Sequence, residues 1–79
     1  MQKPSLGRIV IVPMDPTFNN GSDEAPAVIC RVFDETLINV RIIGDSKEVA
    51  WRTSCKLSDE KPVEFYGKED CVAWWPPRV

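Results

Sequence analysis

Three arginines and two small polar residues are the strongest candidates for a chemical site in this sequence. Guanidinium groups bind phosphates and carboxylates through paired hydrogen bonds, and Asn and Ser side chains add neutral hydrogen bonds to the same ligands. We therefore expect a site for a small anionic or nucleotide ligand. The alternative is an exposed face whose arginines form weak ion pairs with nearby acids. The five residues are Arg31, Asn39, Arg41, Arg52 and Ser54.

Aromatic residues could extend this site toward a base. Phe18 lies in a loop over residues 14–26 that is rich in Pro, Asn, Gly and Asp, and long loops in small domains are often functional. Phe18 could instead only anchor that loop to the core. Trp74 and Trp75 are consecutive, and neighbours on a strand point to opposite faces, so we expect one of them to be exposed. Phe18 or Trp75 is the expected base-stacking residue.

Signatures of catalysis and of metal binding are missing from the sequence. It has no histidine, no G-x-S-x-G motif and no phosphate-binding loop, and its paired acids lie in predicted loops. Cys30, Cys55 and Cys71 are an odd number without C-x-x-C spacing, so neither a zinc site nor a disulfide framework is indicated. We expect no catalytic residues, metal or cofactor, and therefore a protein that is not an enzyme.

The elements that would position these residues are short strands, of which two form a central hairpin. Residues 27–33 and 37–43 alternate in character on either side of a three-residue loop, which predicts a β-hairpin. In the favoured register the apolar face pairs Val32 with Ile38, Cys30 with Val40 and Val28 with Ile42. The opposite face then pairs Arg31 with Asn39 and Ile29 with Arg41.

A further strand over residues 49–55 should pair with the second strand of this hairpin. Its apolar side would place Trp51 opposite Ile42, Thr53 opposite Val40 and Cys55 opposite Ile38. Arg52 would then face Arg41, and like charges directly opposite one another destabilise a sheet. The predicted pairing therefore requires a compensating anion from an acid, another subunit or a ligand.

Two outer strands complete the predicted fold. Residues 7–12 form a first strand that ends at Pro13, and residues 71–75 form a last strand that ends at Pro76, with a polar connection over residues 56–70 before it. Five short strands joined by hairpins indicate an all-β fold, a small five-stranded SH3-like partly open barrel, with an OB-like barrel as the alternative. Residues 1–79 form a single small β-barrel domain.

Composition and size restrict the partners. The net charge of -2 and the pI of about 5.0 disfavour general nucleic-acid binding, which usually requires an excess of Lys and Arg. A chain of 79 residues has a small core, and the first strand carries apolar residues on both faces, so we expect a homo-oligomer. The longest apolar run near the start, Ile9 to Val12, is too short for a signal peptide or a membrane span, so no membrane association is expected.

Several segments resemble small uncharacterised proteins encoded by tailed bacteriophages. That group shares a G-R-I-V start, an A-[IV]-[IV]-x-[RE]-V strand, an [RT]-S segment and a W-x-W-P ending. The corresponding segments here are GRIVIV (Gly7 to Val12), APAVICRVFDETLINVRI (Ala25 to Ile42), WRTS (Trp51 to Ser54) and AWWPPRV (Ala73 to Val79), the last of which departs from the W-x-W-P spacing because Trp74 and Trp75 are adjacent. The resemblance implies an SH3-like barrel and a location in the cytoplasm of an infected bacterium.

The phage context that the resemblance implies suggests two functions. Small phage barrels include sponges, which sequester the nucleotide signals of bacterial immune systems without cleaving them. The leading expectation is therefore a non-enzymatic module that captures an anionic or nucleotide ligand on the arginines. The alternative is a protein-interaction adaptor that inhibits a host protein or decorates the virion.

Overall fold

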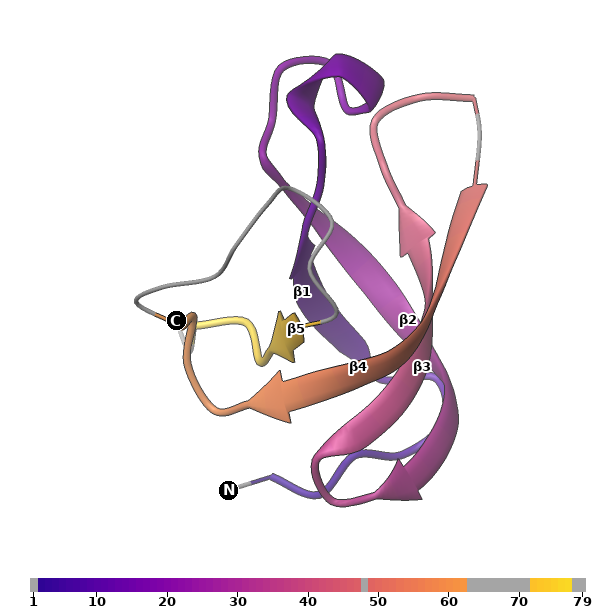
Figure 1. The fold of residues 1–79 in the computed structure, drawn as a ribbon, viewed down its shortest axis with the longest axis vertical. Coiled ribbons are helices and arrows are strands. Elements are labelled where there is room, and N and C mark those ends of the chain that lie inside the picture. The colour runs from indigo at the N-terminus through magenta and orange to yellow at the C-terminus, as the bar shows by residue number, and fades with distance from the viewer. Residues whose placement is uncertain (1, 48, 63–71, 78–79) are drawn as a thin grey trace.

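Five strands form a closed barrel in the order β1-β2-β3-β4-β5 (Figure 1). The computed structural model describes residues 2–47, 49–62 and 72–77. The elements are β1 (Ile9–Pro13), a short 3-10 helix η1 (Pro16–Phe18), β2 (Glu24–Asp34), β3 (Leu37–Ile43), β4 (Val49–Ser58) and β5 (Val72–Trp74). The all-β, five-stranded prediction is confirmed, and the fold is consistent with SH3-like and OB-like small barrels. The barrel is closed, where the sequence analysis expected a partly open one.

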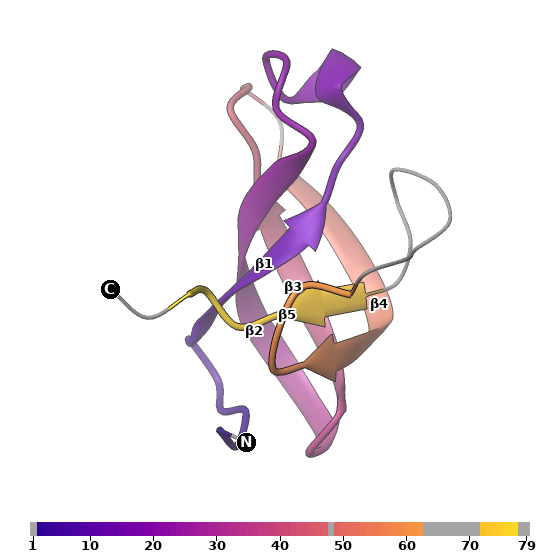
Figure 2. The ribbon, with the colours of Figure 1, turned by 90° about the vertical axis from the view of Figure 1, so that its left-hand side faces the viewer.

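The short strand β5 closes the barrel between β1 and β4 (Figure 2). It is antiparallel to β1, where Trp74 pairs with Ile11, and parallel to β4, where Leu57 pairs with Ala73. A parallel pair needs a crossover rather than a hairpin, so the predicted hairpin connections extend only from β1 to β4. The expected connection over 56–70 begins later, because β4 continues to Ser58, and its part beyond residue 62, like Cys71, lies outside the described residues.

Inward-facing side chains of all five strands fill the barrel. Alternation along β1, along β2 as far as Ile29 and along β3 buries every second residue, as the period of two in a strand requires. Over the described residues, no helix is long and apolar enough to cross a membrane. The core cluster comprises Val10, Val12, Met14, Ala25, Ala27, Ile29, Ile38, Val40, Ile42, Cys55, Leu57, Ala73 and Trp75.

A β-bulge at Cys30 corrects the predicted register of the hairpin. The pairs Val32 with Ile38 and Arg31 with Asn39 are confirmed. Between Arg31 and Ile29 the register shifts by one residue, since Cys30 is an extra residue on β2. The pairs beyond the bulge are Ile29 with Val40, Val28 with Arg41 and Ala27 with Ile42. Ile29 is therefore buried, and Cys30, predicted to be buried, is exposed.

A second register shift, on β4, reverses the predicted inward and outward positions of Trp51 and Arg52. Cys55 pairs with Ile38 as predicted, but Thr53 and Ser54 together oppose one residue of β3, so the register shifts before the next pair. The pairs beyond it are Arg52 with Val40, Trp51 with Arg41 and Ala50 with Ile42. Arg52 does not face Arg41, and Trp51 lies on the outside. The predicted like-charge pair, and its need for a compensating anion, are absent.

The loops above the barrel are tied together by Asn19, which is almost fully buried. Its Nδ2 donates to the carbonyl oxygens of Ser22 and Glu24 at 2.9 and 2.8 Å, and its Oδ1 accepts from the N–H of Asp45 at 2.6 Å. These bonds join the β1–β2 loop to the β3–β4 loop, which lie together at the top of Figure 1. A Cβ atom added to Gly44 would lie 3.1 Å from this amide oxygen. A larger residue at position 44 would therefore displace the Asn19 side chain.

Candidate functional site

One row of outward-facing residues crosses four strands of the barrel. Ile9 of β1 pairs with Val28 of β2, Val28 with Arg41 of β3, and Arg41 with Trp51 of β4. We call these four residues the Trp51 row. Trp51 has 59% of its surface exposed, and Ile9 and Arg41 are exposed as well. Three apolar side chains and one guanidinium thus lie side by side on the outer surface.

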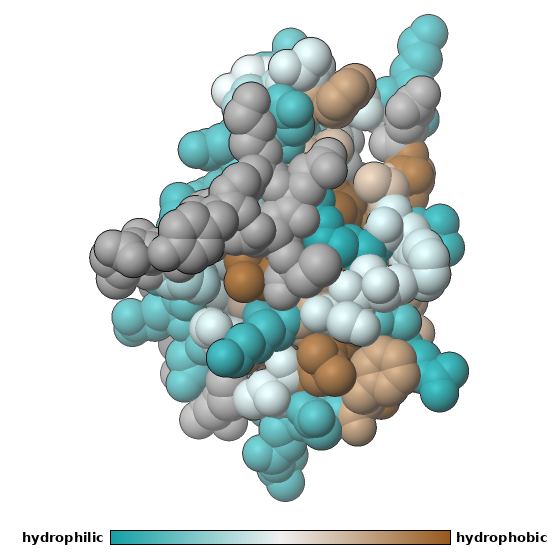
Figure 3. Space-filling view, viewed as in Figure 1, coloured by the Kyte–Doolittle hydropathy of each residue, from teal (hydrophilic) through white to brown (hydrophobic). Residues whose placement is uncertain are grey.

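A second pair extends the apolar surface next to this row. Ile43 of β3 pairs with Val49 of β4, each two residues from a member of the Trp51 row, and both are exposed. Figure 3 shows white and brown side chains on the right-hand side, over β3 and β4, between teal ones. Exposed apolar residues that stand singly are ordinary, whereas contiguous ones mark interaction surfaces.

Two of the predicted arginines lie on this outer face. Arg31 pairs with Asn39, and Asn39 is two residues from Arg41 on β3. Neither arginine takes part in an ion pair within the described part of the chain, where the ion pairs are Lys3 with Glu35 and Lys61 with Glu24. The guanidinium of Arg31 instead lies 5.2 Å from the centre of the Phe33 ring. Among the described residues, Arg31 and Arg41 therefore do not form the ion pairs with acids that the alternative expected.

The other polar residues of the predicted site have structural partners. Arg52 is half-buried and its Nη1 donates to the carbonyl oxygen of Pro13 at 2.8 Å, which joins β4 to the end of β1. Ser54 has a φ of 54° at the bulge, and its N–H donates to Oδ1 of Asn39 at 2.8 Å. Asn39 therefore holds the bulge. The five predicted polar residues divide into two on the outer surface and three that support the barrel.

The predicted stacking residues lie elsewhere. Phe18 ends η1 in the β1–β2 loop and is 59% exposed, so it does not anchor the loop to the core. Trp74 and Trp75 are both buried, and the expectation that one of them is exposed is wrong. Strand β5 ends at Trp74, so alternation does not continue to Trp75, and its ring packs in the core with the guanidinium of Arg8 at 4.9 Å from its centre. The exposed tryptophan is Trp51.

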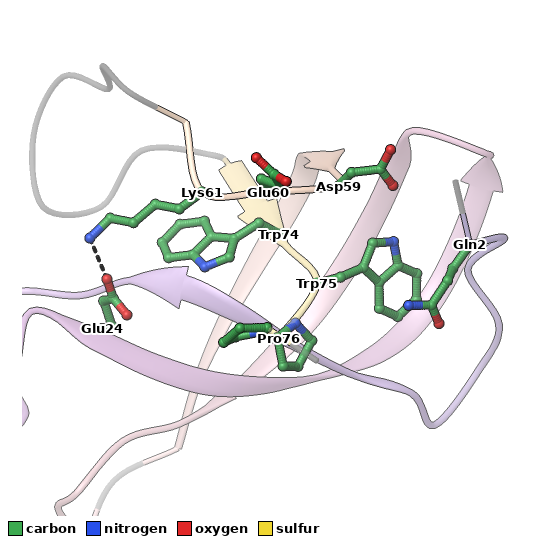
Figure 4. Close-up of a pocket in the computed structure, with 9 residues that line it drawn as sticks. Gln2, Glu24, Asp59, Glu60, Lys61, Trp74, Trp75 and Pro76 are labelled. Carbon is green, nitrogen blue, oxygen red and sulfur yellow. Dashed lines mark hydrogen bonds and ion pairs between the residues drawn. The ribbon is translucent and has the colours of Figure 1, made fainter. Parts of the chain in front are cut away.

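A pocket of about 800 Å³ lies at the closing edge of the barrel, beside β5. Figure 4 shows the indoles of Trp74 and Trp75 along it, with acidic side chains at its rim. Lys61 forms an ion pair with Glu24, which raises the pKa of the lysine ammonium, with a further contribution from Asp23 and against the opposing effect of desolvation. We call this site the Trp75 pocket. The described residues that line it are Gln2, Glu24, Asp59, Glu60, Lys61, Trp74, Trp75, Pro76 and Pro77.

Other site types are not formed by the described residues. In residues 2–47, 49–62 and 72–77, no three His, Cys, Asp or Glu side chains gather where they could hold a metal ion. Comparisons with protein-family models, with curated proteins and with solved structures find no match to this chain. The Trp51 row and the Trp75 pocket are therefore the two candidate sites.

Proposed function

We propose that the chain is a non-enzymatic interaction module that binds a protein partner through the Trp51 row. The observation that carries the proposal is the 59% exposure of Trp51 directly opposite Arg41, in a row that also holds Ile9 and Val28. Trp and Arg are enriched among the residues that contribute most to protein–protein affinity. Apolar neighbours around such a pair exclude water from it when a partner binds.

The shape of the surface supports a macromolecular partner over a small molecule. Small ligands bind in concave sites that enclose most of their surface, whereas the Trp51 row lies on the outside of a barrel. The resemblance to phage proteins suggests a host protein or a component of the virion as the partner, and the small size of the chain suggests a second copy. A second copy is the simplest of these, because a small chain gains burial by association.

Site-specific photocrosslinking in bacteria tests the proposal. Val49, next to Trp51 on β4, is replaced by p-benzoylphenylalanine, and Thr36 in the β2–β3 hairpin loop is replaced in a matched control. We expect a discrete adduct on irradiation from position 49 only, with a mass that identifies a second copy or another protein. Combining the crosslinker with Trp51→Ala or Arg41→Glu should remove the adduct. No adduct at position 49, or the same adducts at position 36, would overturn the proposal.

Capture of an anionic nucleotide is a second candidate, favoured by the unpaired guanidiniums on the same face. Arg31 and Arg41 form no ion pair among the described residues, and Arg41 lies opposite an exposed indole on which a base could stack. If the chain binds a nucleotide, Trp51 rather than Phe18 or Trp75 stacks on the base, and Arg52 does not contact the ligand.

Native mass spectrometry with a panel of cyclic and linear nucleotides separates the two candidates. Nucleotide capture predicts a discrete gain of mass that Arg41→Ala and Trp51→Ala abolish and Lys56→Ala, on the same strand, leaves unchanged. Binding of a protein partner predicts no gain in mass with any nucleotide.

A further inference from the structure

The Trp75 pocket carries an unbalanced negative charge among its described residues. Three carboxylates, from Glu24, Asp59 and Glu60, line it together with one ammonium, from Lys61. Lys61 is paired with Glu24, and neither Asp59 nor Glu60 forms an ion pair in the described chain. Carboxylates on the wall of a pocket favour a cationic ligand and oppose an anionic one.

Each of the two tryptophans that line the pocket has a cationic side chain over its indole ring. The ammonium of Lys61 lies 5.7 Å from the centre of the Trp74 ring while it is paired with Glu24. The guanidinium of Arg8 lies 4.9 Å from the centre of the Trp75 ring. A positive charge over an indole face is attracted by the ring quadrupole, and a carboxylate beside it adds a direct attraction. Trp75 and Asp59 likewise place an indole and a carboxylate in the lining of one pocket.

The buried indole N–H of Trp75 is turned toward one of these two acids. Trp75 is 5% exposed, and its Nε1–H has no hydrogen-bond acceptor among the residues that the structure describes. Figure 4 shows the nitrogen edge of this indole turned toward Asp59. Leaving a buried N–H without an acceptor is costly, so a ligand that brings an acceptor oxygen to this edge gains from the hydrogen bond. Asp59 is on the surface, so its side chain can move to admit such a ligand, whereas Gln2 is half-buried and its Oε1 accepts a hydrogen bond from Nη2 of Arg8.

We propose that the Trp75 pocket binds an arginine or lysine side chain of an extended peptide. Asp59 and Glu60 neutralise the charge, the rings of Trp75 and Pro76 contact the aliphatic stem, and a peptide carbonyl oxygen accepts a hydrogen bond from Nε1 of Trp75. A peptide supplies the cation and the acceptor together, which a simple metal ion or a free amine does not. This site is separate from the Trp51 row and does not depend on the function proposed for it.

The probe is the tripeptide N-acetyl-Ala-Arg-Ala-amide, with N-acetyl-Ala-citrulline-Ala-amide as its matched neutral analogue. Citrulline keeps the length and planar end of arginine and replaces the charged guanidinium with a neutral ureido group. In ¹⁵N-labelled protein, the three indole N–H signals are assigned from Trp51→Phe and Trp74→Phe. We expect the arginine peptide to move the Trp75 indole signal downfield in a saturable titration, with little change at Trp51, and the citrulline peptide to bind about tenfold more weakly or less.

Two charge variants complete the experiment. Asp59→Asn combined with Glu60→Gln should weaken binding of the arginine peptide by about tenfold or more, whereas Glu35→Gln, an acid of the β2–β3 hairpin, should not. Equal binding of the citrulline peptide would overturn the proposal on the unmodified protein alone. So would the absence of a saturable shift at Trp75, or an equal loss in the Glu35→Gln control.

Discussion

At the scale of single residues, Ser54 and Asn39 define the bulge that turns β4. Ser54 has a φ of 54°, a conformation that costs an L-residue free energy, and Oδ1 of Asn39 accepts its N–H at 2.8 Å. The hydrogen bond offsets part of that cost. Asn39 therefore acts on the candidate surface indirectly, by fixing the register that places Trp51 outside.

Removing the Asn39 side chain should lower the free energy of unfolding. Asn39→Ala deletes one hydrogen bond at the bulge, and we expect a loss of about 1 kcal/mol in urea denaturation. The control is Ser54→Gly, which tolerates a positive φ and should raise stability by about 0.5 to 1 kcal/mol. A destabilising Ser54→Gly would contradict the left-handed conformation assigned to this residue.

Cys30 and Cys55 should differ sharply in their reactivity toward a thiol reagent. Cys30 is the exposed residue of the β2 bulge, and Cys55 lies in the core. In a Cys71→Ser background, we expect an aromatic disulfide reagent to label Cys30 in the folded protein and Cys55 only after unfolding. Protection of Cys30 in the folded protein would contradict the bulge on β2 and support the uninterrupted register between β2 and β3.

Much of what the sequence predicts about these residues is correct up to each bulge and wrong beyond it. The pairs Val32 with Ile38 and Cys55 with Ile38 follow from alternation, which is a local property. An extra residue in one strand reverses inside and outside for the residues that follow, and neither Cys30 nor Ser54 is of a type that marks a bulge as glycine does. The predicted clash of Arg41 with Arg52 was the one sign that the register had to shift.

At the scale of elements, Arg52 connects β4 to β1. Its Nη1 donates to the Pro13 carbonyl oxygen, and its half-buried side chain lies on the opposite side of β4 from Trp51. The sequence predicted that all three arginines bind the ligand. In the barrel, Arg52 instead forms a hydrogen bond between two strands that are distant in the chain. This distinction depends on tertiary pairing, which composition and alternation do not contain.

Replacing this arginine should therefore affect stability, whereas replacing the one opposite Trp51 should not. Arg52→Met removes a hydrogen bond from a charged donor, and we expect the free energy of unfolding to fall by about 1.5 to 3 kcal/mol. Arg41→Met removes an exposed side chain and should change it by less than about 0.5 kcal/mol. Urea denaturation measures the free energy of unfolding of both variants. Equal losses would contradict the role of Arg52 in connecting β4 to β1.

The two loops above the barrel should separate when Asn19 is replaced. Asn19→Ala loses three hydrogen bonds and leaves buried backbone groups without partners, and we expect a loss of about 2 kcal/mol or more. Asn20→Gly is the matched control, because Asn20 has a φ of 50° and a single exposed bond to Asp45. The result expected for the control is a loss of about 0.5 kcal/mol or less. Comparable losses in both variants would refute the buried role of Asn19.

At the scale of the whole molecule, the closed barrel separates two surfaces. The Trp51 row crosses β1 to β4 on the outer surface of the barrel, and the Trp75 pocket lies where β5 closes the barrel against β1 and β4. The sequence predicted the five strands and the cationic outer face. It did not predict the pocket, because the pocket depends on the parallel pairing of β5 with β4 and on the burial of both neighbouring tryptophans.

The most direct test of this account is ¹⁹F NMR of protein labelled with 5-fluorotryptophan, in the presence of a soluble paramagnetic agent. The account predicts that one of three tryptophan signals broadens strongly and that Trp51→Phe removes that signal, since Trp51 is exposed and Trp74 and Trp75 are buried. If the signal assigned to Trp75 broadens instead and that of Trp51 is protected, the uninterrupted register is correct. The Trp51 row would then not exist as an outer surface.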